Sequence, residues 1–311
     1  MSVLYTFPGQ GAQRAGMLHA LPDDAAVAAT VAQAAETLGS DPLLLDTESA
    51  LASTRAAQLC LLIAGVAMAR SLAAHGAVPA MVAGFSIGEY AAAVVAGALD
   101  FADAVHLVAR RGQLMEQAYP SGHGMAAIIG LDSAQLEALV AKVHSAATPV
   151  HIANLNARRQ IAIAGSDAGL QAVMALALAN GASRAERLAV SVPSHSPLFD
   201  AAAQQLQAAF ENVTVRRPQL VYLSSSAARA LFDPERIGDS LAFNMARRVH
   251  WVDTVRLAWE RGARLAVEMP PGSVLTRLTA PEFGDGVAMS CDGNRIENIL
   301  TMVSKVGGGS R

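Results

Sequence analysis

Two glycines flank a serine in Gly84-Phe85-Ser86-Ile87-Gly88, a spacing that can build a nucleophilic serine. An apolar run, Ala80 to Ala83, precedes this segment, and a helix-like run, Glu89 to Ala96, follows it. On a sharp turn between a strand and a helix, the Ser86 hydroxyl is lifted off the sheet edge. Glycine fits where the backbone bends most tightly, and the Ile87 N–H is left free at a helix N-terminus to bind an oxyanion. The alternative is an ordinary glycine-rich turn of an α/β sheet, because the three-letter pattern alone is weak.

A serine hydroxyl needs a base that removes its proton, and the chain has eight histidines to choose from. His195 lies between Pro193 and Pro197, in a rigid turn where we expect the chain to return from a small domain and face a cleft. His250, directly before Trp251 at an expected helix start, is the second candidate. No aspartate or glutamate identifies itself as a third triad member, which argues against an ordinary α/β-hydrolase.

A glycine-rich loop, Pro8-Gly9-Gln10-Gly11, follows the first expected strand, Val3 to Phe7. A dinucleotide site would need a third glycine where Arg14 stands, and an acidic residue after a second strand, which is missing. The competing interpretation is a loop that offers backbone N–H groups to a ligand above the sheet.

The composition indicates a globular protein and excludes several classes of function. Of the 311 residues, 52% are hydrophobic and only 16% are charged, with a net charge of −3, so we expect no nucleic-acid partner. Cys60 and Cys291 lack metal-ligand spacing and are expected to be reduced core residues. No signal-peptide pattern is present, and the longest apolar run, Leu59 to Ala69, is too short to span a bilayer. We therefore expect a cytoplasmic protein without a membrane partner, and a flexible tail at 307–311.

Helices and strands alternate along the chain, with a change of pattern in the middle. In the first part we expect strands at 3–7 and 78–85 and helices at 23–38, 55–75, 87–96 and 100–118. In the middle we expect strands at 125–131, 150–155, 160–164 and 185–190 and helices at 133–145 and 166–180. In the last part we expect helices at 197–210, 233–246 and 251–261 and strands at 220–223 and 265–269.

The predicted fold is α/β, with a parallel-sheet, α/β-hydrolase-like core and an inserted small domain. The middle segment has the order β-α-β-β-α-β, which is the split, ferredoxin-like arrangement. The large catalytic domain would comprise residues 1–123 and 192–311, and the small domain residues 124–191. The last part alternates as the first does, and therefore should complete the first sheet.

A set of motifs resembles the malonyl-CoA:acyl-carrier-protein transacylase family over nearly the whole chain and in the family's order. The set is Phe7-Pro8-Gly9-Gln10-Gly11, Gly84 to Tyr90, Arg111-Gly112, Gln160 to Gly165, Val192-Pro193-Ser194-His195 and Pro271 to Leu275. Within the family, the first motif and the Val82 to Gly88 elbow look most like the transacylase (epsilon) subunit of bacterial malonate decarboxylase.

The resemblance implies an acyltransferase that moves a malonyl group from malonyl-CoA to the thiol of an acyl carrier protein, by a ping-pong route through malonyl-Ser86. No metal or redox cofactor is implied, and the narrower assignment makes the malonate decarboxylase carrier protein the acceptor. By position, Ser86 matches the nucleophile and His195 its base, and the N–H groups of Gln10 and Ile87 match the oxyanion hole. Arg111 matches the arginine that holds the malonyl carboxylate.

The chemistry of Arg111 agrees with this role, and two further positions acquire a role from the same resemblance. The planar Arg111 guanidinium can hold a carboxylate through two parallel hydrogen bonds, although a solvated helix face beside Arg110 is the competing interpretation. Gln160 matches a glutamine near the acyl site. His250 stands where relatives often carry another polar residue, and a backbone carbonyl at this point accepts the ring N–H of the family's catalytic histidine. Such a carbonyl would replace the missing third acid.

The chain departs from the family pattern in two places. Phe85 replaces a histidine that many relatives carry before the nucleophile, and we expect it to shape the pocket. Arg158 and Arg159 lie on a turn expected to face the cleft, where they could hold CoA phosphates or an acidic carrier protein, or could simply be solvated.

Two other classes of function remain open from the residues alone. A serine hydrolase of thioesterase type would use the same serine and histidine with water as acceptor. A docking subunit that keeps the fold without catalysis is the other, and the intact set of Ser86, His195 and Arg111 argues against it.

Overall fold

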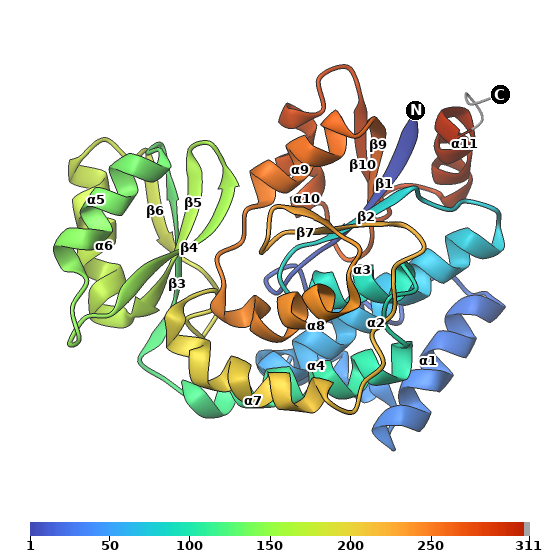
Figure 1. Ribbon diagram of the computed structural model, residues 1–311, viewed down its shortest axis with the longest axis horizontal. Coiled ribbons are helices and arrows are strands. Elements are labelled where there is room, and N and C mark those ends of the chain that lie inside the picture. Colours follow the sequence, from blue (N-terminus) through green and yellow to red (C-terminus); the bar gives the residue numbers. More distant parts are fainter. Residues whose placement is uncertain (308–311) are drawn as a thin grey trace.

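The computed structural model describes residues 1–307 and contains two β-sheets flanked by helices (Figure 1). Residues 308–311, and with them most of the expected tail, lie outside the described part. The larger sheet has six strands in the order β10-β9-β1-β2-β7-β8. Its strands are β1 (Ser2–Phe7), β2 (Met81–Gly84), β7 (Val221–Ser224), β8 (Arg229–Leu231), β9 (Ala263–Glu268) and β10 (Val287–Ser290).

The six-stranded sheet is parallel at every pairing except the one between β7 and β8. The prediction of a parallel sheet therefore needs a correction at this edge. Only residues 225–228 link the two strands, and a parallel pair needs a crossover of a dozen residues or more. The short link therefore forces an antiparallel hairpin.

Helices cover both faces of the six-stranded sheet (Figure 1). Their bounds are α1 (Ala25–Leu38), α2 (Thr54–Ala74), α3 (Gly88–Val95), α4 (Phe101–Ala118), α7 (Asp200–Phe210), α8 (Pro234–Phe243), α9 (Trp251–Glu260), α10 (Val274–Thr279) and α11 (Ile296–Gly307). Short 3₁₀ turns occur at Pro42–Leu45, Ala50–Ala52, Pro197–Phe199, Asn244–Ala246 and Ala280–Glu282.

Helix α2 is the central buried helix, as its apolar sequence predicts. The Ser53 hydroxyl accepts a hydrogen bond from the Ala56 N–H and caps its N-terminus. By length and composition α2 could cross a membrane, but 89% of its most apolar window is buried inside the protein. A helix that is apolar on all sides belongs in a core, and α2 packs against α1, α3 and α4 there.

The smaller sheet has four antiparallel strands in the order β4-β5-β3-β6, and it has the predicted β-α-β-β-α-β chain order. Its elements are β3 (His123–Ile129), α5 (Ser133–Val143), β4 (Val150–Ala157), β5 (Gln160–Ser166), α6 (Asp167–Ala179) and β6 (Arg184–Arg187). Alternation along β3 separates two cores. Ala126 and Ile128 pack into a core with residues of α5 and α6, whereas Met125 belongs to the main core.

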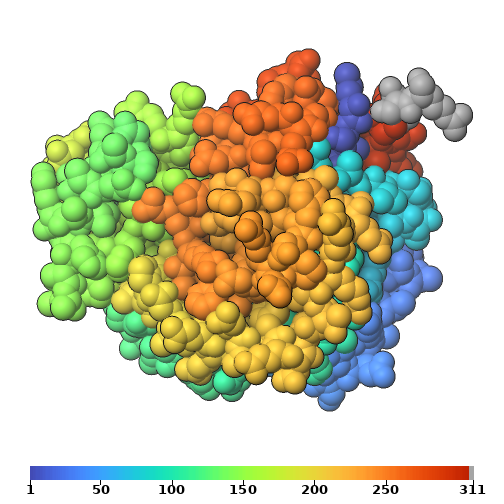
Figure 2. All heavy atoms as spheres, in the orientation of Figure 1, coloured from blue at the N-terminus to red at the C-terminus, as the bar shows by residue number. Residues whose placement is uncertain are grey.

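Backbone hydrogen bonds join the edge strand β4 of the smaller sheet to Val249, in the segment between the Asn244–Ala246 turn and α9. The Leu155 N–H donates to the Val249 carbonyl at 2.8 Å, and the Val249 N–H donates to the Ala153 carbonyl at 2.9 Å. The space-filling view shows the green segment of the four-stranded sheet lying directly against the yellow and orange segments of the larger part (Figure 2).

Several details differ from the expected elements. The sequence pattern does not predict β8, β10, α10 or α11, and the strand expected at 185–190 ends at Arg187.

Asp100 stands at the N-cap position of α4 but makes no side-chain cap hydrogen bond there. Its carboxylate instead accepts two hydrogen bonds from Arg216, at 2.8 and 2.9 Å, because the α7–β7 connection brings this guanidinium alongside.

Candidate active site

Ser86 lies on a tight turn between β2 and α3, as predicted. Its φ of 56° is in the left-handed region, which only a few non-glycine residues occupy. A Cβ added to Gly84 would overlap the backbone of Gly88 and Glu89, and one added to Gly88 would overlap the Phe7 carbonyl. The elbow therefore requires both glycines for steric reasons.

His195 contacts Ser86 directly, with 2.7 Å between the imidazole Nε2 and the hydroxyl Oγ. The Nδ1 atom of the same ring lies 2.9 Å from the Asn244 carbonyl and 3.0 Å from the Arg247 carbonyl. Carbonyls can only accept, so Nδ1 carries the proton and Nε2 is free to accept the proton of Ser86. The arrangement is a dyad oriented by two carbonyls.

The environment of His195 keeps its ring neutral. Burial, and to a smaller extent the nearby positive charge of Arg111, together lower the imidazole pKa to about 4. His195 is only 3% exposed, and its backbone N–H donates to the Met245 carbonyl at 2.7 Å. The ring is therefore in its basic form at pH 7.

The structure brings Ser86 to His195 and not to His250. His250 directly precedes α9 as its N-cap residue, where its backbone N–H donates to the Ser225 carbonyl at 2.8 Å and its Nδ1 is 3.7 Å from the Asp253 carboxylate. Of the two candidate bases, His250 is thus wrong, because its ring lies by Asp253 and does not line the Ser86 cavity. The carbonyls that hold His195 come from Asn244 and Arg247, earlier in the chain than expected.

Two backbone N–H groups near Ser86 are free, as an oxyanion hole requires. Within residues 1–307, neither the Gln10 N–H nor the Ile87 N–H has a hydrogen-bond acceptor, although the next three N–H groups after Ile87 do. Gln10 lines the same small cavity as Ser86, of about 30 Å³. The Gln10 side chain is held by the Thr54 hydroxyl, 3.4 Å from its Nε2.

Arg111 reaches the same cavity from α4 and is 1% exposed. Its Nη2 donates to the Asn244 side-chain oxygen at 2.9 Å, and its Nε is buried without a partner in the described chain. Burial lowers the guanidinium pKa to about 10, so the group stays charged at pH 7. The interpretation as a solvated face is wrong for Arg111 and fits the exposed Arg110.

A buried cation with a free donor, beside a nucleophile, is suited to bind an anionic part of a substrate. Among residues 1–307 there is no cluster of three or more histidine, cysteine or acidic side chains that could hold a metal ion. Cys60 and Cys291 are both buried and free, as expected, and burial raises the pKa of each thiol.

Asn244 is the site residue that the sequence does not predict. It is fully buried and contacts three others: its Oδ1 accepts from Arg111, its carbonyl accepts from His195, and its Nδ2 lies 3.3 Å from the Ser86 carbonyl. An asparagine within an otherwise apolar stretch that ends a helix is the signal that could have indicated it.

The remaining sequence-predicted residues lie outside the dyad. Gln160 begins β5, pairs with Ile129 and does not line the Ser86 cavity. Arg158 and Arg159 are exposed on the β4–β5 turn and line none of the described cavities. Phe85 does line the Ser86 cavity, and it packs edge-on against Trp251 with 5.6 Å between ring centres.

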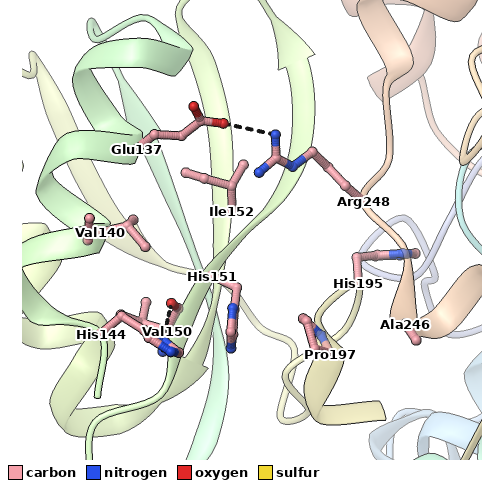
Figure 3. A pocket seen from close by; sticks show the side chains of 11 residues that line it. Glu137, Val140, His144, Val150, His151, Ile152, His195, Pro197, Ala246 and Arg248 are labelled. Carbon is pink, nitrogen blue, oxygen red and sulfur yellow. Dashed lines mark hydrogen bonds and ion pairs between the residues drawn. The ribbon is translucent and has the colours of Figure 1, made fainter. Parts of the chain in front are cut away.

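Two larger cavities flank this small one. One, of about 500 Å³, shares Gln10 and Val190 with it and is otherwise lined by residues 120–123 and 187–191 and parts of the first loop and the Ala50–Ala52 turn. The other, of about 520 Å³, lies between α5, β4 and the His195 loop (Figure 3). Figure 3 shows the Glu137–Arg248 ion pair, 2.9 Å long, at one side and the His195 ring pointing away from Glu137.

Comparison with known proteins gives one consistent result at the level of sequence. Residues 4–290 match the family model described as an acyl transferase domain. The malonyl CoA-acyl carrier protein transacylase of Haemophilus influenzae is 38% identical over 307 residues, covering 94% of this chain and 97% of the relative. The enzyme of the same name from Bacillus subtilis is 34% identical, covering 89% of each chain.

Solved structures agree with the sequence relatives. An acyl-carrier-protein S-malonyltransferase from Burkholderia pseudomallei has a TM-score of 0.91 and 37% identity, covering 97% of this chain and all of that one. A malonyl-transacylase in complex with its type II PKS acyl-carrier protein has a TM-score of 0.90 and 33% identity, covering 98% of this chain and 99% of that one.

Proposed function

The chain belongs to the acyl transferase domain family, and we propose that it moves a malonyl group from malonyl-CoA to the thiol of an acyl carrier protein. One observation carries the malonyl part of this proposal. Arg111 is charged and buried, it lines the same small cavity as the Ser86–His195 dyad, and its Nε donor has no partner among residues 1–307. A short acyl chain with a terminal carboxylate would meet both groups at once.

The first half-reaction loads the serine. His195 Nε2 accepts the Ser86 proton while Oγ attacks the thioester carbonyl carbon. The N–H groups of Gln10 and Ile87 stabilise the oxyanion, each contributing ~3 kcal/mol if they act like donors in comparable sites. The C–S bond then breaks, the proton returns from His195 to sulfur, and CoA leaves as a thiol.

The second half-reaction unloads the serine by the same chemistry in reverse. A carrier thiol gives its proton to His195 and attacks the carbonyl of malonyl-Ser86. The oxyanion collapses, the Oγ–carbonyl bond breaks, and His195 returns a proton to Ser86. The Asn244 and Arg247 carbonyls hold the Nδ1–H throughout, and they stabilise the imidazolium that forms in each half.

Mixing the protein with malonyl-CoA without a carrier tests the proposal. We expect intact-mass spectra to show one malonyl group on the wild type and none on Ser86→Ala, with peptide mapping placing it on Ser86. A wild type that gains no malonyl mass would contradict the proposed function.

A serine hydrolase of thioesterase type is the alternative, with water in place of the carrier thiol. The relatives and structures reported above carry transacylase or malonyltransferase names, which favours transfer. The two are separated by the rate of malonyl-CoA consumption with and without carrier protein. A transferase should accelerate strongly when the carrier is added.

The narrower assignment, loading of the malonate decarboxylase carrier protein, is also a proposal. Its support is the Val82 to Gly88 elbow and the N-terminal motif. Comparing kcat/KM for that carrier and for a fatty-acid-type acyl carrier protein tests it, and a preference for the latter would exclude it.

We further propose that catalysis needs no metal or redox cofactor, since each bond change above uses only protein groups. Activity should therefore survive treatment with a chelator. We also propose that the protein is located in the cytoplasm, and that it divides into a large domain of residues 1–123 and 192–311 and a small domain of residues 124–191.

A further inference from the structure

We propose that the Asn244 side chain is a positioning residue, which holds the Arg111 guanidinium in the orientation that selects acyl groups with a terminal carboxylate. This inference rests on the proposed function and extends it to a residue other than Ser86, His195 and Arg111. It concerns only the amide side chain of Asn244, because the backbone carbonyl serves His195.

The first support is the way in which Arg111 is held. An arginine side chain has several rotatable bonds, so a fixed guanidinium plane requires a fixed partner. Here the only hydrogen bond of the guanidinium within residues 1–307 is the 2.9 Å contact from Nη2 to Asn244 Oδ1. The Nε is buried and has no partner in the described part of the chain, so it is left for a ligand.

The second support is the way in which Asn244 itself is held. Its Nδ2 lies 3.3 Å from the Ser86 carbonyl, and its backbone is helical, with φ −49° and ψ −42°, at the start of the 3₁₀ turn that follows α8. The amide therefore links the carbonyl of the nucleophile to the guanidinium. We call the place where Arg111 would hold the substrate carboxylate the carboxylate slot. Its distance from the attacking Ser86 oxygen must match the length of the acyl group, and the Asn244 side chain thereby sets this distance.

The third support is burial. Asn244 is 0% exposed and Arg111 is 1% exposed, so water cannot substitute for a lost contact without entering the core. Removing one partner of such a pair leaves a buried donor unsatisfied. The freed Nη2 would then turn toward another acceptor, and the carboxylate slot would lose its geometry.

The test compares acylation of Ser86 by malonyl-CoA and by acetyl-CoA, which lacks the carboxylate. For Asn244→Ala we expect the preference for malonyl-CoA, as the ratio of kcat/KM values, to fall at least tenfold, mainly through KM for malonyl-CoA. Asn244→Asp should lower the same ratio, because its carboxylate would pair with Arg111 and compete with the substrate. A purely structural role would instead lower both rates together.

A double-mutant cycle makes the test specific for Arg111. If Asn244 acts through Arg111, the double variant Arg111→Ala/Asn244→Ala should show the same substrate ratio as Arg111→Ala alone. An additional, independent loss would overturn the inference. Thermal melting of each variant checks folding, and the near-isosteric Asn244→Asp provides the comparison if Asn244→Ala proves unstable.

Failure of the inference and failure of the proposed function give different results. A wild type that malonyl-CoA does not acylate would overturn both. A wild type that is acylated, with Asn244 variants that keep the wild-type preference for malonyl-CoA, would overturn the positioning role alone.

Discussion

At the scale of single residues, the site depends on the charge of Arg111 and on the position of one proton on His195. His195 is kept neutral by burial and by the cationic Arg111, and its proton is held on Nδ1 by two carbonyls. The missing acid that the sequence left unexplained is thus replaced by backbone oxygens. These carbonyls accept a hydrogen bond from Nδ1–H without removing its proton, and Nε2 stays free to accept the proton of Ser86.

The pH dependence of acylation follows from these residues. With a His195 pKa of about 4, the base loses activity only when the pH falls toward that value, well below the 6.5 of an ordinary histidine. Removing the positive charge in Arg111→Gln should raise the pKa and move the acid limb of kcat/KM to higher pH. Burial remains as the larger cause, so the limb should stay below 6.5.

Acetyl-CoA is the substrate for this measurement, because its acylation does not need the arginine to bind a carboxylate. Arg110→Gln is the matched control, since this neighbour is exposed and should leave the limb where it is. An acid limb that does not move in Arg111→Gln would contradict the electrostatic link between the two side chains.

At the scale of elements, the elbow is determined by how closely β1, β2 and α3 approach one another. The Phe85 N–H donates to the Phe7 carbonyl at 2.9 Å, so β1 continues alongside the turn. The buried Glu89, in the first turn of α3, accepts hydrogen bonds from the Ser225 and Ser226 N–H groups at 2.9 and 3.0 Å. One helix start thus anchors both the nucleophile and the loop after β7.

Gly88→Ala should destabilise the protein strongly, because the new Cβ would overlap backbone atoms of Phe7 that cannot move independently. We expect a loss of about 2–3 kcal/mol or more in the free energy of unfolding, measured by denaturant titration.

Gly238→Ala provides the control in α8. Its added Cβ would meet only side-chain atoms, the nearest at 3.7 Å. Alanine also favours the helix by roughly 0.5–1 kcal/mol over glycine. Equal effects of the two substitutions would refute the steric explanation.

At the scale of the whole molecule, the smaller sheet pairs with the segment that orients the dyad. Val249 pairs with the edge strand β4, and Arg247, two residues earlier, supplies a carbonyl to His195. The Glu137–Arg248 ion pair joins the same segment to α5. Both of its side chains are partly exposed, so its contribution should be about 0–1 kcal/mol, and the backbone pairing matters more.

Val249→Pro removes the N–H that donates to Ala153 and should therefore loosen the segment that holds His195. We expect kcat for acylation to fall about tenfold, or ~1.4 kcal/mol in barrier height, with KM changed less. Val249→Ala keeps the backbone donor and should leave kcat near the wild-type value while lowering stability. An unchanged kcat in a folded Val249→Pro variant would show that the pairing is irrelevant to catalysis.

Local features of this protein follow from the sequence by itself. The serine turn with its two glycines, the cap of α2 by Ser53 and the β-α-β-β-α-β order of the middle segment all depend on residues close in the chain. Steric exclusion, capping and side-chain alternation act over a few residues, so their pattern is visible without coordinates. The identity of the site residues Ser86, His195 and Arg111 came from the motif set as a whole.

Only the tertiary structure decided which of these groups meet. Ser86 and His195 are 109 positions apart, and two candidate histidines could not be separated by local pattern alone. The burial of Arg111, the contacts of Asn244 and the reversal of β8 likewise depend on what packs alongside. Contacts between distant segments are set by the packing of whole elements, and no short stretch of sequence carries that information.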